Sequence, residues 1–178
     1  MSGPAPEVLQ RARAVRLMIF DVDGVLTDGA LWYGPRGEAL KRFHAFDGHG
    51  VKMLAAAGVP SAILSSRRSK AVAMRAAELG IKHVIQGVAD KLAAFTQLLK
   101  RLNLKGENTG YMGDELLDLP VLTRCGFACA PGEAPAEVRS RVHYVAAAPA
   151  GGGAVREVCE LLMRAQGTLE RTLQSYLV

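Results

Sequence analysis

Short apolar runs alternate along the chain with segments whose apolar residues recur at the spacing of a helix. Most of the apolar runs lack alternation between apolar and polar residues, as expected of strands covered by helices on both faces. This order is typical of βαβ units, so the sequence predicts an α/β fold with a doubly wound, mostly parallel, Rossmann-like sheet and helices on both faces. The predicted strands lie within residues 16–21, 59–65, 81–86, 109–113, 126–130 and 143–145.

The clearest helix prediction covers residues 91–102, where one stripe holds Leu92, Phe95, Leu98, Leu99 and Leu102. Residues 69–79 and 154–165 show similar spacing. A glycine follows the expected end of a helix at three places: Gly58, Gly80 and Gly167. Helices often end in a residue with left-handed backbone conformation, which glycine adopts most easily.

Residues 30–43 interrupt the alternation directly after the first predicted strand. Two short strand-like runs flank Gly34-Pro35-Arg36-Gly37, which indicates a β-hairpin. The chain lacks a linker, so residues 1–178 are expected to form a single domain with this hairpin as a flap and residues 167–178 as a tail. The segments between the predicted strands are too short for a separate cap domain, since domains begin at about 50 residues.

The composition is that of an ordinary globular protein, with 178 residues of which 49% are hydrophobic and 22% charged. Lys and Arg number 22 against 17 Asp and Glu, and the net charge of +5 suits an anionic ligand. Aromatic residues make up only 6%, and they are not interleaved with basic residues as in base-stacking surfaces. A nucleic-acid partner is therefore not expected.

Three cysteines, Cys125, Cys129 and Cys159, form no CxxC pair and fit free thiols in a reducing compartment. A zinc site from Cys125, Cys129 and His143 is an alternative, although its spacing matches no standard ligand pattern. The chain starts with charges where a signal peptide needs an apolar run, and no stretch reaches the roughly 18 apolar residues of a membrane span. We expect a cytoplasmic protein without a membrane partner.

Two carboxylates follow the first predicted strand, in Asp21-Val22-Asp23-Gly24. Residues two apart on an extended chain project to the same side, so Asp21 and Asp23 can face one site at the carboxyl end of the strand. Mg²⁺ would relieve their repulsion. The alternative is a simple helix cap, whereas a calcium-binding EF-hand loop is excluded because Leu26 and Trp32 stand where glycine and glutamate are required.

A second acidic cluster follows the strand predicted at residues 109–113. Asp114 would stand at the carboxyl end of this strand, and Asp118, one helical turn further, could support it. The alternative is that both acids only stabilise the start of a helix through its dipole.

Ser65 and Lys91 stand at comparable positions on other predicted elements. Ser65 ends a strand just before a helix, where its hydroxyl can hold a phosphate oxygen, and no G-x-S-x-G elbow marks it as a nucleophile. Lys91 is the first residue of a predicted helix. A positive charge there interacts unfavourably with the helix dipole, so the position indicates that the lysine has a functional role.

Together these motifs, in this order along the chain, resemble the haloacid dehalogenase-like phosphohydrolases. The segment Phe43–Gly50 of the form F-H-x-x-D-G-x-G, Lys91 and residues 153–167 further resemble the branch of that family that hydrolyses 3-deoxy-D-manno-octulosonate 8-phosphate for lipopolysaccharide synthesis. Phosphatases of related nine-carbon sugar acids share much of these segments and remain an alternative, as does a non-catalytic binding module on the same scaffold.

The resemblance implies a role for each motif residue. Asp21 would be the nucleophile that forms an aspartyl-phosphate, and Asp23 the acid and base. Asp21, the backbone carbonyl of Asp23, and Asp114 would bind Mg²⁺, while Ser65 and Lys91 would hold the transferring phosphoryl group.

The resemblance also implies the substrate contacts and the assembly. Relatives are tetramers in which subunits cover one another's sites, so a homotetramer with the hairpin at an interface is expected, and the tail would either reach a neighbour's site or pack locally. The chain departs from many relatives at Phe46, where they have arginine, and at Ser66, where they have glycine. The expected contacts to a phosphorylated sugar acid are Asp23, His44, Ala45, Phe46, Asp47, Gly48, Lys52, Arg67, Arg75 and Lys91.

Overall fold

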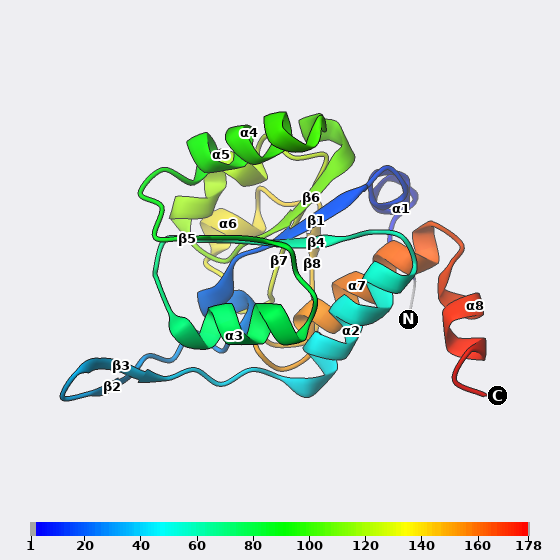
Figure 1. The fold of residues 1–178 in the computed structure, drawn as a ribbon. Helices are drawn as coiled ribbons and strands as arrows, with labels where there is room; N and C mark the ends of the chain where they lie inside the picture. Colours follow the sequence, from blue (N-terminus) through cyan, green and yellow to red (C-terminus); the bar gives the residue numbers. More distant parts are fainter. Residues whose placement is uncertain (1–2, 178) are drawn as a thin grey trace.

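The computed structural model describes residues 3–177, and its centre is a parallel sheet of six strands in the order β5-β4-β1-β6-β7-β8 (Figure 1). The apolar strand β1 lies in the middle, paired with β4 on one side and β6 on the other. The predicted doubly wound α/β fold is confirmed. The strands are β1 (Leu17–Phe20), β4 (Ser61–Ser65), β5 (His83–Gln86), β6 (Thr109–Met112), β7 (Phe127–Ala130) and β8 (Tyr144–Val145).

Helices cover both faces of the sheet, and alternate residues of the central strand point to each. Met18 and Phe20 pack toward α1 (Pro6–Arg13), α2 (Ala45–Ala56), α3 (Lys70–Glu78) and α7 (Ala154–Ala165). Leu17 and Ile19 pack toward α4 (Lys91–Leu102), α5 (Leu119–Leu122) and α6 (Ala136–Arg139). The helix prediction for residues 91–102 is confirmed at both ends, and the three glycines expected after helices all have positive φ: Gly58, Gly80 and Gly167.

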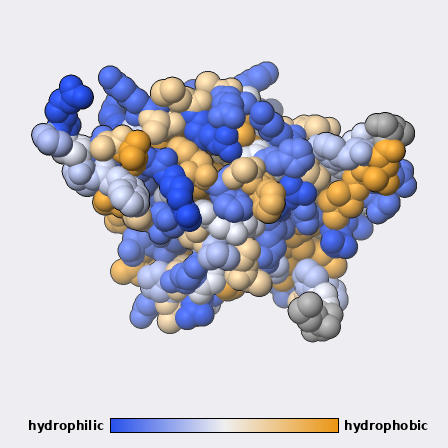
Figure 2. All heavy atoms as spheres, turned by 90° about the horizontal axis from the view of Figure 1, so that it is seen from below, coloured by the Kyte–Doolittle hydropathy of each residue, from blue (hydrophilic) through white to orange (hydrophobic). Residues whose placement is uncertain are grey.

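The predicted hairpin is present as a separate two-stranded antiparallel sheet, β2 (Trp32–Gly34) and β3 (Gly37–Leu40). Between β1 and β4 the chain forms the turn Val22–Leu26, the hairpin and α2. The hairpin and the C-terminal helix α8 (Leu169–Gln174) stand out from opposite sides of the molecule, and both carry apolar side chains (Figure 2). The last residue of the predicted tail, Val178, lies outside the described residues.

None of the helices between residues 3 and 177 combines the length and the apolar character that crossing a bilayer requires. The three cysteines are free and buried, and burial raises the pKa of each thiol, to about 12 for Cys125. These thiols therefore stay protonated at neutral pH.

Candidate active site

The turn after β1 fixes the first two carboxylates. One oxygen of Asp21, Oδ1, accepts a hydrogen bond of 2.7 Å from the backbone N–H of Val22. The helical turn Val22–Leu26 then contains two residues outside the helical region, Asp23 (φ −73°, ψ 123°) and Gly24 (φ 77°). A side chain at residue 24 would be strained by this positive φ and would overlap the carboxylate of Asp114, so the turn requires glycine.

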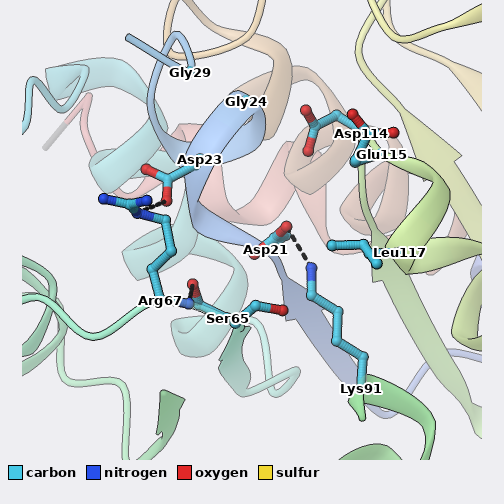
Figure 3. Close-up of a pocket in the computed structure, with 11 residues that line it drawn as sticks. Asp21, Asp23, Gly24, Gly29, Ser65, Arg67, Lys91, Asp114, Glu115 and Leu117 are labelled. Carbon is cyan, nitrogen blue, oxygen red and sulfur yellow. Dashed lines mark hydrogen bonds and ion pairs between the residues drawn. The ribbon is translucent and has the colours of Figure 1, made fainter. Parts of the chain in front are cut away.

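The carboxyl ends of β1, β4 and β6 meet at one edge of the sheet, where they surround a cavity of about 270 Å³ (Figure 3). Asp21 follows β1, Ser65 ends β4, Asp114 follows β6, and Lys91 reaches in from the first residue of α4. The structure thus brings together the residues expected to carry the chemistry, because parallel neighbouring strands end at the same edge. The cavity is lined by Asp21, Asp23, Gly24, Gly29, Ser65, Ser66, Arg67, Lys91, Asp114, Glu115 and Leu117.

Lys91 is buried between two carboxylates. Its Nζ lies 2.6 Å from Asp21 Oδ2 and 2.6 Å from Asp118 Oδ1, and only 4% of its side chain is exposed. Burial alone would lower the pKa of Lys91, but the two carboxylates outweigh it and the pKa is raised. Asp90 caps the helix by accepting a hydrogen bond from the N–H of Ala93, which fixes where α4 begins. Lys91 therefore presents a permanent positive charge beside Asp21.

Asp118 was expected only as a support for Asp114, and the structure gives it a larger role. Its Oδ1 also accepts a hydrogen bond of 2.5 Å from the hydroxyl of Tyr111 in β6, and its Oδ2 accepts from the backbone N–H groups of Asp114 and Glu115. Sequence reasoning missed Tyr111. A tyrosine within an apolar strand was the available signal, because a buried hydroxyl needs a partner.

Asp21, Asp114 and Asp118 offer carboxylate oxygens that all lie within 4.8 Å of one another. Burial and mutual repulsion raise the pKa of Asp21 to about 6 and that of Asp114 to about 7. Among residues 3–177, the buried Asp114 Oδ1 has no hydrogen-bond partner. An unpartnered oxygen in an all-oxygen cluster fits a hard divalent cation such as Mg²⁺.

The alternative prediction of a zinc site at Cys125, Cys129 and His143 is wrong. Within the described part of the chain, the three acids above are the only group of His, Cys, Asp or Glu residues close enough to share a metal ion. The Nδ1 of His143 instead accepts a hydrogen bond of 2.8 Å from the backbone N–H of Ala128.

Asp23 faces two cations, one from the hairpin and one from the loop after β4. Its Oδ1 pairs with Lys41, and its Oδ2 lies 3.5 Å from Arg67 Nε (Figure 3). Arg67 is held in turn by Glu38, at 3.3 Å, and by the hydroxyl of Tyr33, at 2.8 Å. Sequence reasoning missed Lys41, Glu38 and Tyr33, since the hairpin pattern says nothing about which side chains fold back toward β1.

Only part of the expected substrate contacts line the cavity in the described chain: Asp23, Arg67 and Lys91. Asp47 is buried, and its carboxylate accepts hydrogen bonds from the backbone N–H groups of Gly153 (3.2 Å) and Arg156 (2.8 Å) at the start of α7. The structure thus gives Asp47 a capping role. The other expected contacts lie on or beside α2 and α3, away from the cavity lining: His44, Ala45, Phe46, Gly48, Lys52 and Arg75.

Comparison with known protein families finds one model that matches residues 62–158, described as haloacid dehalogenase-like hydrolase. Among curated proteins, 3-deoxy-D-manno-octulosonate 8-phosphate phosphatase KdsC from Salmonella typhimurium is 44% identical over 169 residues, which cover 94% of this chain and 90% of that protein. The protein of the same name from Escherichia coli K12 is 43% identical over the same shares of both chains.

Solved structures of phosphatases are also similar to this chain. A probable YrbI family phosphatase from Pseudomonas syringae superposes with a TM-score of 0.96 at 45% identity, covering 98% of this chain and 99% of that one. A 3-deoxy-D-manno-octulosonate 8-phosphate phosphatase from Moraxella catarrhalis, in complex with magnesium, phosphate and KDO, superposes with a TM-score of 0.93 at 38% identity, covering 96% and 98%.

Proposed function

The chain belongs to the haloacid dehalogenase-like hydrolases, and we propose that it is a magnesium-dependent phosphatase that converts 3-deoxy-D-manno-octulosonate 8-phosphate to KDO and phosphate for lipopolysaccharide synthesis. The observation that carries the proposal is the placement of Asp21 at the cavity, where it pairs with the buried Lys91 and shares a cluster of carboxylate oxygens with Asp114 and Asp118. Relatives named for this reaction support the choice of substrate.

The carboxylates of Asp21 and Asp114, together with the backbone carbonyl of Asp23, would hold the Mg²⁺. The ion supplies positive charge that offsets the repulsion between the phosphoryl oxygens and the attacking carboxylate. Within residues 3–177 the buried Asp114 Oδ1 lacks a hydrogen-bond partner, and a bound cation would provide one.

In the first step the carboxylate of Asp21 attacks phosphorus. A bond forms between the carboxylate oxygen and phosphorus while the bond from phosphorus to the sugar oxygen breaks, and Asp23 gives its proton to that leaving oxygen. Lys91, 2.6 Å from Asp21, would balance charge on the phosphoryl oxygens, and the Ser65 hydroxyl would hold one of them.

In the second step water attacks phosphorus of the aspartyl-phosphate. Asp23, now ionised, takes a proton from this water, phosphate leaves, and the carboxylate of Asp21 is restored. Asp23 returns to its protonated form, so the cycle closes without a further reactant.

Recognition of the sugar acid would begin at Arg67, whose guanidinium lies at the cavity rim and can bind a carboxylate through two hydrogen bonds. Lys52, Arg75 and residues 44–46 are proposed as further contacts. Phosphatases of nine-carbon sugar acids are the second candidate, since Phe46 replaces the arginine of many relatives and is 67% exposed.

We also propose a cytoplasmic homotetramer whose subunits cover one another's cavities. The hairpin exposes Trp32 (56%), Tyr33 (63%) and Leu40 (65%), and Leu116 and Leu117 are exposed beside the cavity. Apolar side chains gathered in this way favour a protein interface. Light scattering that finds a fully active monomer would contradict the tetramer.

The decisive experiment is phosphate release from 3-deoxy-D-manno-octulosonate 8-phosphate, with and without Mg²⁺, compared with a panel of other phosphate monoesters that includes a nine-carbon sugar acid 9-phosphate. The expected result is Mg²⁺-dependent release with the highest kcat/KM for the eight-carbon acid. A higher value for the nine-carbon acid would favour the second candidate, and no release from any ester would favour a binding module.

A further inference from the structure

We propose that Lys41 is a positioning residue that docks the hairpin onto Asp23 and commits one oxygen of that carboxylate, so that the other is left for proton transfer. The proposal rests on the proposed function for the role of Asp23, while the docking itself can be measured without substrate. Lys41 directly follows β3 and lies outside the cavity lining of the described chain.

The first observation is the burial of Lys41. Only 1% of its side chain is exposed, although it belongs to a hairpin that projects from the molecule. Lysine is almost never buried unless it is paired, and on a surface hairpin its ammonium ordinarily stays in water. Here the ammonium contacts Asp23 Oδ1 and lies 3.1 Å from Glu38 Oε2, so its charge is matched by one carboxylate of the turn after β1 and one of the hairpin.

The second observation is that the two oxygens of Asp23 have different partners. Oδ1 is held by the buried Lys41, whereas Oδ2 lies 3.5 Å from Arg67, whose side chain is 39% exposed. In the described part of the chain the Arg67 Nε atom is buried but makes no hydrogen bond, so its contact with Oδ2 at 3.5 Å is weaker than the contact of Lys41 with Oδ1. Lys41 therefore fixes the rotamer of Asp23 through Oδ1 and leaves Oδ2 as the oxygen that can exchange a proton with the leaving group.

The third observation concerns the rest of the hairpin. Glu38 joins Lys41 to Arg67, and Tyr33 bonds to the same guanidinium. The hairpin thus contacts Asp23 directly through Lys41 and indirectly through Arg67, which contacts Asp23, Glu38 and Tyr33. Removing the Lys41 charge should loosen the hairpin and free the Asp23 side chain together.

The first test uses Lys41→Met, which keeps the stem of the side chain and removes the ammonium, with Lys41→Arg as the variant that restores the charge. Hydrogen exchange of the backbone amides at residues 32–40 is measured without substrate. We expect exchange about tenfold faster in Lys41→Met and close to wild type in Lys41→Arg. Asp23→Asn should speed exchange as well, and combining it with Lys41→Met should add little, because both remove the same contact.

The second test compares kcat/KM for the sugar phosphate and for p-nitrophenyl phosphate, whose leaving group needs little protonation. Poor orientation of Asp23 should lower the value for the sugar phosphate by about ten- to a hundredfold in Lys41→Met and much less for the nitrophenyl ester. Lys41→Arg should recover most of the loss. Arg36→Met removes an exposed charge at the hairpin turn and is the matched control.

Equal losses with both esters, or equal defects in Lys41→Met and Lys41→Arg, would overturn the positioning role. Unchanged hydrogen exchange in Lys41→Met would overturn the docking. A wild-type protein that hydrolyses neither ester would instead defeat the proposed function, and the exchange measurement would still decide whether Lys41 docks the hairpin.

Discussion

Gly24 and Asp114 line the same cavity so close together that a β-carbon on residue 24 would overlap the Asp114 carboxylate. We expect Gly24→Ala to push the Asp114 carboxylate aside and to weaken Mg²⁺ binding by about ten- to a hundredfold. The dependence of phosphate release on Mg²⁺ concentration measures the effect. Gly58→Ala is the matched control, because Gly58 also has a positive φ, of 97°, but has open space around a β-carbon. Equal Mg²⁺ dependence in the two variants would contradict the prediction.

Asp21→Asn should abolish turnover and leave the fold intact. An amide cannot form the acyl phosphate, so phosphate release should fall about a thousandfold or more. Circular dichroism and phosphate release measure the two outcomes. Asp28→Asn makes the same change in the following loop, where the carboxylate pairs with Arg42 near the surface, and should keep its activity. Retention of even about a tenth of the wild-type rate by Asp21→Asn would remove Asp21 from the nucleophile role.

Lys91→Met should destabilise the protein as well as inactivate it. The substitution leaves the carboxylates of Asp21 and Asp118 buried without their shared cation, and breaking a buried ion pair in this way costs about 3–5 kcal/mol. Chemical denaturation measures the loss. Lys100→Met on the exposed side of the same helix is the control. Adding Asp118→Asn to Lys91→Met should recover part of the stability, since it removes one of the unpaired charges.

Stability of the metal-free protein should fall as pH rises from about 4 to about 7. The pKa values of Asp21, about 6, and Asp114, about 7, are raised above the 3.8 of an unperturbed aspartate. The folded state therefore binds these protons more tightly than the unfolded chain, and the stability they contribute is complete below the unfolded pKa and lost through pH 6–7.

Mg²⁺ binds the deprotonated carboxylates, so its effect on Tm should be larger at about pH 8 than at about pH 5. Thermal unfolding at both pH values, with and without Mg²⁺, measures this. Asp114→Asn should remove much of the pH dependence. An equal Tm increase at both pH values in the wild type would contradict the prediction.

Deletion of residues 174–178 should lower turnover with little change in unfolding free energy. The ring of Tyr176 meets His49 of α2 edge-on, with 5.4 Å between centroids, but Tyr176 is 58% and Leu177 84% exposed. Packing on the same subunit thus buries little of residues 174–177, which favours a contact with a neighbour. Unchanged kinetics in a deletion variant of unchanged oligomeric state would favour local packing instead.

The parts of the site at strand ends could be predicted from the sequence because topology alone determines where they lie. Asp21, Ser65 and Asp114 each follow a short apolar run, and parallel strands that are neighbours in a sheet bring such residues to one edge. Lys91 could be identified for a different reason, since a lysine at the start of a helix is unfavourable without a nearby anion.

The hydrogen-bonded partners of these residues could not be predicted in the same way. Two such pairs are Tyr111 with Asp118 and Lys41 with Asp23. They depend on side-chain rotamers and on how the hairpin bends, and the spacing of apolar residues along the sequence predicts neither. For Asp47 the sequence predicted a role that the structure does not show. Residues 43–50 resemble a substrate-binding motif, whereas the Asp47 carboxylate caps α7. The helix α1 also escaped prediction, since only Ala12 of its eight residues is buried.

The order of the strands has a consequence for the chain during its synthesis. The proposed nucleophile, Asp21, directly follows the first strand of the sheet to be made, but its lysine partner and the second carboxylate come only with α4 and the loop after β6. A fragment that ends before that loop lacks the proposed second metal ligand and should release no phosphate. The proposed site is therefore complete only once β6 lies beside β1.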